Sequence, residues 1–276
     1  MKWQSIIAAG AALAWTVGAI AAQAGEVLDR VTSKGVMMMA TDPEYPPQSS
    51  LNDQNEFEGF DIDVGREIAR RLEVEIEFVT PGWDVLTAGN WAGRWDVSVG
   101  SMTPTAARRE VLDFPAIYYF TPAALVVHKD NTTITKPADA SGKTIGVGIA
   151  TTYEQYLKKD LVIDAAGAPP FDYLIDDANI RTYDSDLLAV DDLKLGDGVR
   201  LDAVITALPT AAGAIDQDFP LKVVVDALFL EPLGVAIDKG DAEWGAKLKE
   251  IIDAMHADGT LSELSQKWYG ADLTGG

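Results

Sequence analysis

The pattern of apolar and polar positions along the chain predicts strands that alternate with helices. Residues 35–40 form a short apolar run before a Thr-Asp-Pro sequence, which is typical of a buried strand that leads into a loop. In residues 60–72, apolar side chains recur every three or four positions between charged ones, as on an amphipathic helix. Strand patterns follow at 74–79 and 96–100, and a helix is expected to begin near Thr105. This order predicts a parallel sheet with helices on both faces.

The same order begins again after the middle of the chain. Residues 143–148 have a strand pattern, and Thr151 with Glu154 matches a capping box at the start of a helix. A further strand is expected at 201–206, and residues 242–269 carry two helical patterns. We therefore predict an α/β protein of two lobes, each with a mostly parallel sheet flanked by helices.

The element order also predicts how the two lobes are connected. Lobe 1 is expected to comprise residues 25–121 plus 232–276, and lobe 2, which interrupts it, residues 122–231. Segments 122–127 and 226–233 are the expected hinge crossings. Rotation about two such crossings would close the lobes over a ligand.

The first residues have the pattern of an export signal. Lys2 supplies positive charge, residues 6–22 contain no ionisable side chain, and Ala22-Gln23-Ala24 offers a small-x-small cleavage site. The alternative is an N-terminal membrane anchor, but the apolar run is rich in alanine and a good cleavage site follows it. No later stretch is long and apolar enough to span a bilayer. We expect a signal peptide at residues 1–24 and a secreted mature chain that begins near Gly25.

Composition excludes several kinds of chemistry and partner. The chain has no cysteine, which rules out disulfides, thiol catalysis and a cysteine-based lipid anchor. It has 43 acidic and 22 basic residues, a formal net charge of −21 that would repel nucleic acid and anionic lipid surfaces. No metal-ligand spacing is present, so we expect neither a metal nor another cofactor.

Five short motifs follow one another along nearly the whole mature chain. They are residues 41–47 (TDPEYPP), 59–64 (GFDIDV), 100–108 (GSMTPTAAR) with 112–114 (LDF) after it, 142–147 (GKTIGV) and 201–204 (LDAV). In order and spacing they resemble the periplasmic amino-acid-binding proteins of solute-binding protein family 3. The resemblance implies a type II periplasmic binding fold. It also implies a monomeric periplasmic protein that captures an amino acid or amino-acid-like zwitterion for the membrane permease of an ABC importer.

Arg108 is the strongest candidate for a ligand contact. It follows a Gly-Ser-x-Thr loop, where free backbone N–H groups and hydroxyls gather near a helix start, and a guanidinium there can bind a carboxylate with two parallel hydrogen bonds. The alternative is a surface salt bridge with Glu110 or Asp113. The resemblance implies that Arg108 binds the ligand α-carboxylate, with help from Ser101 and Thr103.

Three aromatic residues and one acid complete the first-lobe candidates. The resemblance places Tyr45, Phe60 and Trp83 as walls around the ligand side chain, where aromatic faces supply apolar area and attract cations. The alternative for each of these rings is packing in the lobe core. The resemblance also implies that Asp42 contacts a cationic end of the ligand, although an Asp before Pro also commonly shapes a turn.

The second lobe provides two further candidates and one departure from the family pattern. The resemblance implies that Thr151 and Thr152 contact the ligand when the cleft shuts, while helix capping is the alternative. Ala207 stands where many members have the aspartate that holds the ligand α-ammonium, and a buried unpaired ammonium is costly. Either the ligand has a modified or displaced amine near Asp42, or another acid such as Asp184 or Asp186 replaces the lost one.

An enzyme is the competing hypothesis, because the resemblance extends to a few proteins of this fold that are dehydratases acting on small carboxylic acids. Catalysis requires a positioned acid, base or nucleophile. The two histidines, His128 and His256, fall within no recognised site motif. We therefore expect no catalytic residues.

Overall fold

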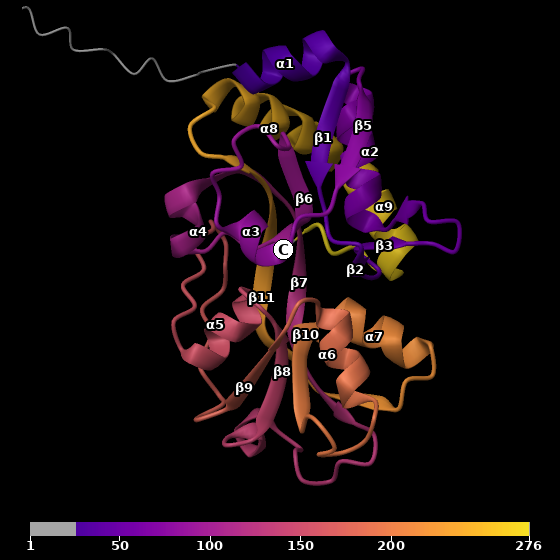
Figure 1. Ribbon diagram of the computed structural model, residues 1–276, viewed down its shortest axis with the longest axis vertical. Helices are drawn as coiled ribbons and strands as arrows, with labels where there is room; N and C mark the ends of the chain where they lie inside the picture. The colour runs from indigo at the N-terminus through magenta and orange to yellow at the C-terminus, as the bar shows by residue number, and fades with distance from the viewer. Residues whose placement is uncertain (1–25, 276) are drawn as a thin grey trace, which may run out of the picture.

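The computed structural model describes residues 26–275, so the expected signal peptide at 1–24 lies outside the described residues. Most strands join one sheet of eight, in the order β5-β1-β6-β11-β7-β10-β8-β9. Two long strands at its centre, β7 (Leu112–His128) and β11 (Leu221–Asp238), run from the upper half of the molecule into the lower half (Figure 1). They are antiparallel to each other, whereas the pairs β1–β5, β1–β6, β8–β9 and β8–β10 are parallel. The predicted α/β fold with mostly parallel sheets is confirmed.

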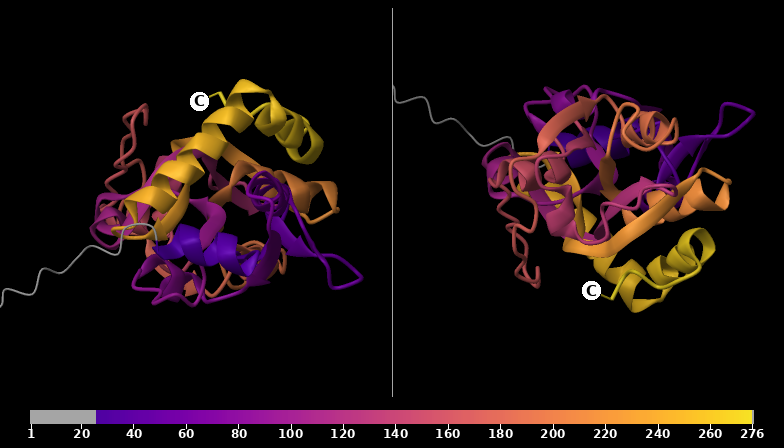
Figure 2. Two further views of the ribbon diagram at one scale, coloured as in Figure 1. Left: turned by 90° about the horizontal axis from the view of Figure 1, so that it is seen from above. Right: turned by 90° about the horizontal axis from the view of Figure 1, so that it is seen from below.

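The remaining elements divide between the two halves. The upper half contains α1 (Glu26–Lys34), β1 (Val36–Ala40), α2 (Phe60–Arg71), β5 (Glu75–Val79), α3 (Trp83–Thr87), β6 (Val97–Met102), α4 (Ala106–Val111), α8 (Ala242–Ala257) and α9 (Thr260–Tyr269), with a small sheet of β2 (Glu44–Tyr45), β3 (Ser49–Leu51) and β4 (Phe57–Glu58). The lower half contains η1 (Pro137–Ala140), β8 (Thr144–Gly148), α5 (Thr152–Lys158), β9 (Asn179–Tyr183), α6 (Asp186–Leu193), β10 (Ala203–Ala207) and α7 (Leu208–Asp216). Figure 2 shows α8 and α9, in yellow, as an outer layer of the upper half. Among the described residues, no helix combines the length and apolar character that crossing a membrane requires.

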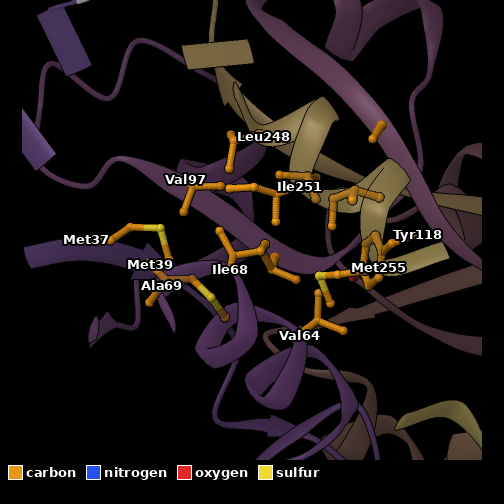
Figure 3. Packing of buried hydrophobic residues seen from close by; sticks show 14 of the residues in the cluster. Met37, Met39, Val64, Ile68, Ala69, Val97, Tyr118, Leu248, Ile251 and Met255 are labelled. Atoms are coloured by element: carbon orange, nitrogen blue, oxygen red, sulfur yellow. The ribbon is translucent and has the colours of Figure 1, made fainter. Parts of the chain in front are cut away.

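The upper core forms because strand β1 alternates its side chains between two faces. Met37 and Met39 are fully buried on one face, beside Ile68 of α2 and Ile251 of α8 (Figure 3). Met38 points to the other face and packs against a second cluster around Trp91. Flexible thioethers fill irregular space between helices and sheet, so the Met run is core and lies outside the cavity described below.

The lower half has cores on both faces of its sheet. Along β10, Ile205 joins the cluster under α5, whereas its neighbour Val204 joins the cluster under α6 and α7. The upper core ends at Tyr119 on β7 and Leu233 on β11, and the lower core begins at Ala123 and Phe229. The expected lobe boundaries at 121/122 and 231/232 fall within these intervals.

Gly59 fixes the start of α2 and thereby the position of residues 47–49, which pass beside it. Its φ of 132° lies in a region that side-chain-bearing residues rarely adopt. A Cβ at this position would lie 2.2 Å from the carbonyl oxygen of Gln48. Only glycine therefore lets residues 47–49 pass this close to the helix start, where Asp61 N–H donates to the Gln48 carbonyl.

We expect Gly59→Ala to lower the free energy of unfolding by about 1–3 kcal/mol, because both the φ angle and the space oppose a side chain. Urea titration would measure the loss. Gly213→Ala in α7 is the matched control, since a Cβ there meets nothing within 4 Å. That change should be neutral or stabilise by up to about 1 kcal/mol. Equal effects of the two substitutions would contradict this account.

Candidate ligand-binding site

A cavity lies between the two halves and is lined by residues from both. Eight of the nine candidates from the sequence line it, namely Asp42, Tyr45, Trp83, Ser101, Thr103, Arg108, Thr151 and Thr152. Gly100, Gly148, Ile149, Tyr153, Asp184, Ser185, Asp186 and Glu231 complete the lining. The fold therefore brings together residues that are up to 189 positions apart in the chain.

Arg108 is buried, with 4 % of its surface exposed, and does not form the surface salt bridge considered above. Thr105 caps helix α4 and sets the direction of the residue. The guanidinium donates from Nη1 to the Thr103 carbonyl and from Nη2 to the Ala150 carbonyl, each at 2.9 Å, and lies 5.4 Å from the Trp83 ring. Its Nε has no partner among the described residues. Burial lowers the pKa of Arg108 to about 10, so the side chain remains a cation at neutral pH.

The hydroxyl of Ser101 is already engaged by protein groups. It donates to Asp61 at 2.6 Å and shares a hydrogen bond with the Tyr119 hydroxyl. The Ser101 N–H donates to the Tyr118 hydroxyl at 2.8 Å, and these contacts hold the residue at a φ of 54°. Burial raises the pKa of Asp61 to about 7. Ser101 thus shapes the cavity wall, while its hydroxyl donates to Asp61.

Glu231 is the lining residue that the sequence analysis missed. It lies on β11 between the upper and lower cores, 3 % exposed, and accepts hydrogen bonds from Thr103 at 2.8 Å and from Thr152. Burial raises the pKa of Glu231, and the two threonine hydroxyls partly oppose the rise. An acid within the apolar run 227–237 was the available signal. The hydroxyls of Thr103 and Thr152 therefore already serve a carboxylate of the protein itself.

Thr151 adopts the capping role that was the alternative to ligand contact. Its hydroxyl donates to the Gly148 carbonyl at 2.7 Å and accepts from the Glu154 N–H at 3.3 Å. Its position in the lining leaves the ligand role a prediction. The Thr151 hydroxyl has no second hydrogen to donate, so a ligand carboxylate could meet the backbone of this residue but not its hydroxyl.

Two acids occupy the opposite part of the cavity. Asp186 opens α6, is 6 % exposed, and accepts from Thr206 at 2.7 Å and from the Gly148 N–H at 3.2 Å. Burial raises its pKa to about 7, and the negative charges of Asp42 and Glu231 add to the rise. Asp42 accepts from the Glu44 N–H at 2.8 Å, which is the expected turn geometry, and burial raises its pKa as well.

Contacts across the cavity mouth hold the halves together. The hydroxyls of Tyr45 and Tyr153 lie 3.3 Å apart, and Ser185 donates to Glu44 at 2.9 Å. Thr105 and Ile163 pair as an isolated β-bridge between the halves. Trp83 contributes a buried Nε1 that has no partner among the described residues. In the described state the two halves are therefore in contact, and the buried donors Arg108 Nε and Trp83 Nε1 have no partner among the described residues.

Phe60 is placed differently from the expectation that it forms a wall of the site. It is fully buried in the upper core, with ring centroids 5.9 Å from Tyr118, 4.8 Å from Tyr119 and 5.1 Å from Tyr269. The first residue of α2 points into the sheet rather than toward the cavity. Phe60 packs against the two tyrosines that hold Ser101, so it supports the site from behind.

Comparison with known proteins agrees with this geometry. The family model "Bacterial extracellular solute-binding proteins, family 3" matches residues 37–271. The chain belongs to this family. It is 30 % identical over 250 residues to the L-cystine-binding protein TcyJ of Escherichia coli (strain K12), covering 90 % of this chain and 88 % of that protein. It is 31 % identical over 241 residues to the L-arginine-binding protein of Pseudomonas aeruginosa, covering 84 % of this chain and 86 % of that protein.

A solved structure extends the comparison to three dimensions. The ancestral amino acid-binding protein AncCDT-1, a precursor of cyclohexadienyl dehydratase, matches with a TM-score of 0.75 and 31 % identity over 88 % of this chain and 99 % of that one. The two-lobe, type II periplasmic binding fold is thereby confirmed for this member of the family. All three of these relatives are named as proteins that bind amino acids.

The raised pKa of Asp186 predicts a pH-dependent stability of the ligand-free protein. In the folded state Asp186 keeps its proton up to a pH of about 7, whereas in the unfolded state an aspartate loses its proton near pH 4. Because the folded state binds more protons between these values, the free energy of unfolding should fall as the pH rises from about 4 to about 7. Asp186→Asn should reduce this slope, as measured by urea titrations from pH 5 to pH 8. Asp253→Asn on the exposed face of α8 controls for the change in net charge. An unchanged slope in Asp186→Asn would show that the carboxyl is not perturbed.

Proposed function

We propose that this protein captures an amino acid or amino-acid-like zwitterion in the periplasm and presents it to the membrane permease of an ABC importer. The observation that carries the proposal is that a buried guanidinium, Arg108, and two buried acids, Asp186 and Glu231, line the same cavity between the halves. A zwitterion offers a carboxylate to the guanidinium and a cation to the acids. Membership in the solute-binding family supports the transport role.

The carboxylate of the ligand binds Arg108 in this proposal. Arg108 Nε and Trp83 Nε1 are buried donors without a partner among the described residues, both residues line the cavity, and anions satisfy such donors with short, strong hydrogen bonds. Thr103, Thr151 and Thr152 border the same region and contribute backbone groups, because their hydroxyls already have protein partners. The positive end of the ligand lies near Asp42, with Tyr45 beside it.

The lobes that close over this ligand are residues 25–121 plus 232–276 and residues 122–231. The lobe assignment is supported by the change of core along β7 and β11. The protein acts as a monomer after removal of residues 1–24 by signal peptidase. It needs no cofactor, because binding and release require only the closure of the lobes around the ligand.

A dehydratase is the alternative, and two observations favour considering it. One is the likeness to AncCDT-1, and the other is a carboxyl of Asp186 with a pKa of about 7, which suits a general acid. We propose that the protein is not an enzyme. The two buried acids of the cavity, Asp186 and Glu231, already accept hydrogen bonds from protein groups that hold the closed structure. Turnover of a prephenate-like acid, reduced by Asp186→Asn, would establish the alternative instead.

Arg108→Ala should weaken binding more than tenfold while the protein stays folded. Removing one partner of a buried charge pair costs roughly 2–5 kcal/mol. Calorimetry would measure it with the compound that gives the largest thermal shift among standard amino acids, betaines and N-modified amino acids. Arg70→Ala on exposed α2 is the control and should bind as the parent does. Parent-like affinity in Arg108→Ala would place the carboxylate elsewhere.

Ligand should also shift the protein toward the closed form described here. The contacts between Tyr45 and Tyr153, and between Glu44 and Ser185, are available only when the lobes meet. Small-angle scattering should therefore give a smaller radius of gyration with saturating ligand than without it. Identical scattering curves in the presence of a ligand whose binding calorimetry has verified would contradict closure by rotation.

A further inference from the structure

The cavity holds more carboxyl groups than a single zwitterion can pair. Four lining residues are acidic, namely Asp42, Asp184, Asp186 and Glu231, whereas Arg108 is the single basic one among the lining residues described. The ligand's carboxylate and Arg108 neutralise each other. One ammonium then leaves at least one buried acid without a counter-charge, and an unpaired buried charge is costly.

Sheet register relates the missing aspartate to Glu231. Ala207, at the position where many relatives have the ammonium-binding acid, pairs with Ala123 on β7, which in turn pairs with Phe229 on β11. Glu231 pairs with Thr121, two residues further along both strands. Directly paired residues share a face and the face repeats every second residue, so Ala207 and Glu231 lie on one face in adjacent rows.

Glu231 is also near the group that binds the carboxylate. The Thr103 hydroxyl donates to Glu231 at 2.8 Å, and the Thr103 carbonyl accepts from Arg108 at 2.9 Å, so one residue joins the two groups. The negative charge of Glu231 also opposes the fall in the pKa of Arg108 that burial causes. In an α-amino acid the carboxylate and the ammonium are attached to the same carbon atom. A carboxylate bound by Arg108 therefore places the α-ammonium beside Arg108 as well, where Glu231 is the buried acid.

Asp42 and Asp186 form a separate acidic pair. Asp186 is on the α6 side of β10, since it accepts from Thr206, whose side chain points away from the face of Ala207. Asp42 and Asp186 both line the cavity. Ser185, next to Asp186, donates to Glu44, whose N–H donates to Asp42. The charge of Asp42 also raises the pKa of Asp186. Tyr45, three positions after Asp42 in the chain, also lines the cavity. A carboxyl pair beside an aromatic ring suits a second cation.

We propose that Glu231 holds the α-ammonium of the ligand in place of the missing aspartate, and that Asp42 with Asp186 holds a second cation at the end of the ligand side chain. The ligand class is thus an α-amino acid with a cationic side chain. The modified amine considered from the sequence is no longer required, because an acid for the α-ammonium is present on another strand. This inference rests on the proposed function, of which it specifies the substrate class.

Calorimetry with three matched ligands tests both halves of the inference. The ligands are arginine, its neutral isostere citrulline, and 5-guanidinopentanoic acid, which is arginine without the α-amine. In the parent, each altered ligand should bind at least about tenfold more weakly than arginine. In Glu231→Gln, removal of the α-amine should cost several-fold less than in the parent. In Asp186→Asn, the difference between arginine and citrulline should shrink in the same way.

The design separates charge recognition from an effect on lobe closure. The amide introduced by Glu231→Gln keeps a side-chain oxygen for Thr103 and Thr152, so the variant should fold, and a weaker closure would affect arginine and its des-amino analogue equally. Glu263→Gln on the exposed face of α9 controls for net charge. Equal cost of α-amine removal in the parent and in Glu231→Gln would overturn the role of Glu231.

Two further results would separate this inference from the proposed function. If citrulline or another neutral amino acid binds the parent as tightly as arginine, the second cation site is wrong while the amino-acid-binding function stands. If no amino acid binds the parent, the proposed function fails and this inference fails with it.

Discussion

Arg108 carries a positive charge into the interior, and the free energy of its desolvation constrains the structure around it. Two carbonyl oxygens accept from its guanidinium, one from Thr103 in the upper half and one from Ala150 in the lower half. The bond to Ala150 can exist only when the halves meet. Glu231 lies on β11, one of the two strands that join the halves. It accepts hydrogen bonds from Thr103 of the upper half and from Thr152 of the lower half. The closed state is thus built around the same charges that a ligand has to satisfy.

Elements with a strong local pattern could be predicted from the sequence. Strand β1 is apolar and ends before a Thr-Asp-Pro sequence, helix α2 has a regular apolar period, and Thr105 and Thr151 begin helices as capping residues. The small sheet of β2, β3 and β4 was not predicted, because strands of two or three residues contain too few positions to show a period. Local signals therefore gave the frame of each lobe.

Side-chain roles in the site depend on contacts that no local pattern contains. Thr103 and Glu231 are 128 positions apart, and Thr152 and Glu231 are 79 apart, so their meeting follows only from the crossing of β11 between the lobes. Phe60 matched a family position, yet the first turn of α2 directs its ring into the core. Ser101 was expected to help Arg108 bind the ligand, and its hydroxyl donates to Asp61, a contact that the sequence did not indicate. Residue type and spacing identified the cavity wall but could not say which atoms face inward.

The pairing of β7 with β11 has a mechanical consequence for the connection between the lobes. From Phe229 to Leu233 the two strands pair residue by residue, but between Val225 and Phe229 four steps along β11 correspond to two steps along β7. Strand β11 therefore has two more residues than β7 in this interval, an irregularity on one side of the connection between the lobes. A rotation that shortens or lengthens the path along β11 can be absorbed there without breaking the pairs next to Glu231. The lobes can therefore change their angle while the charged centre between them keeps its dimensions.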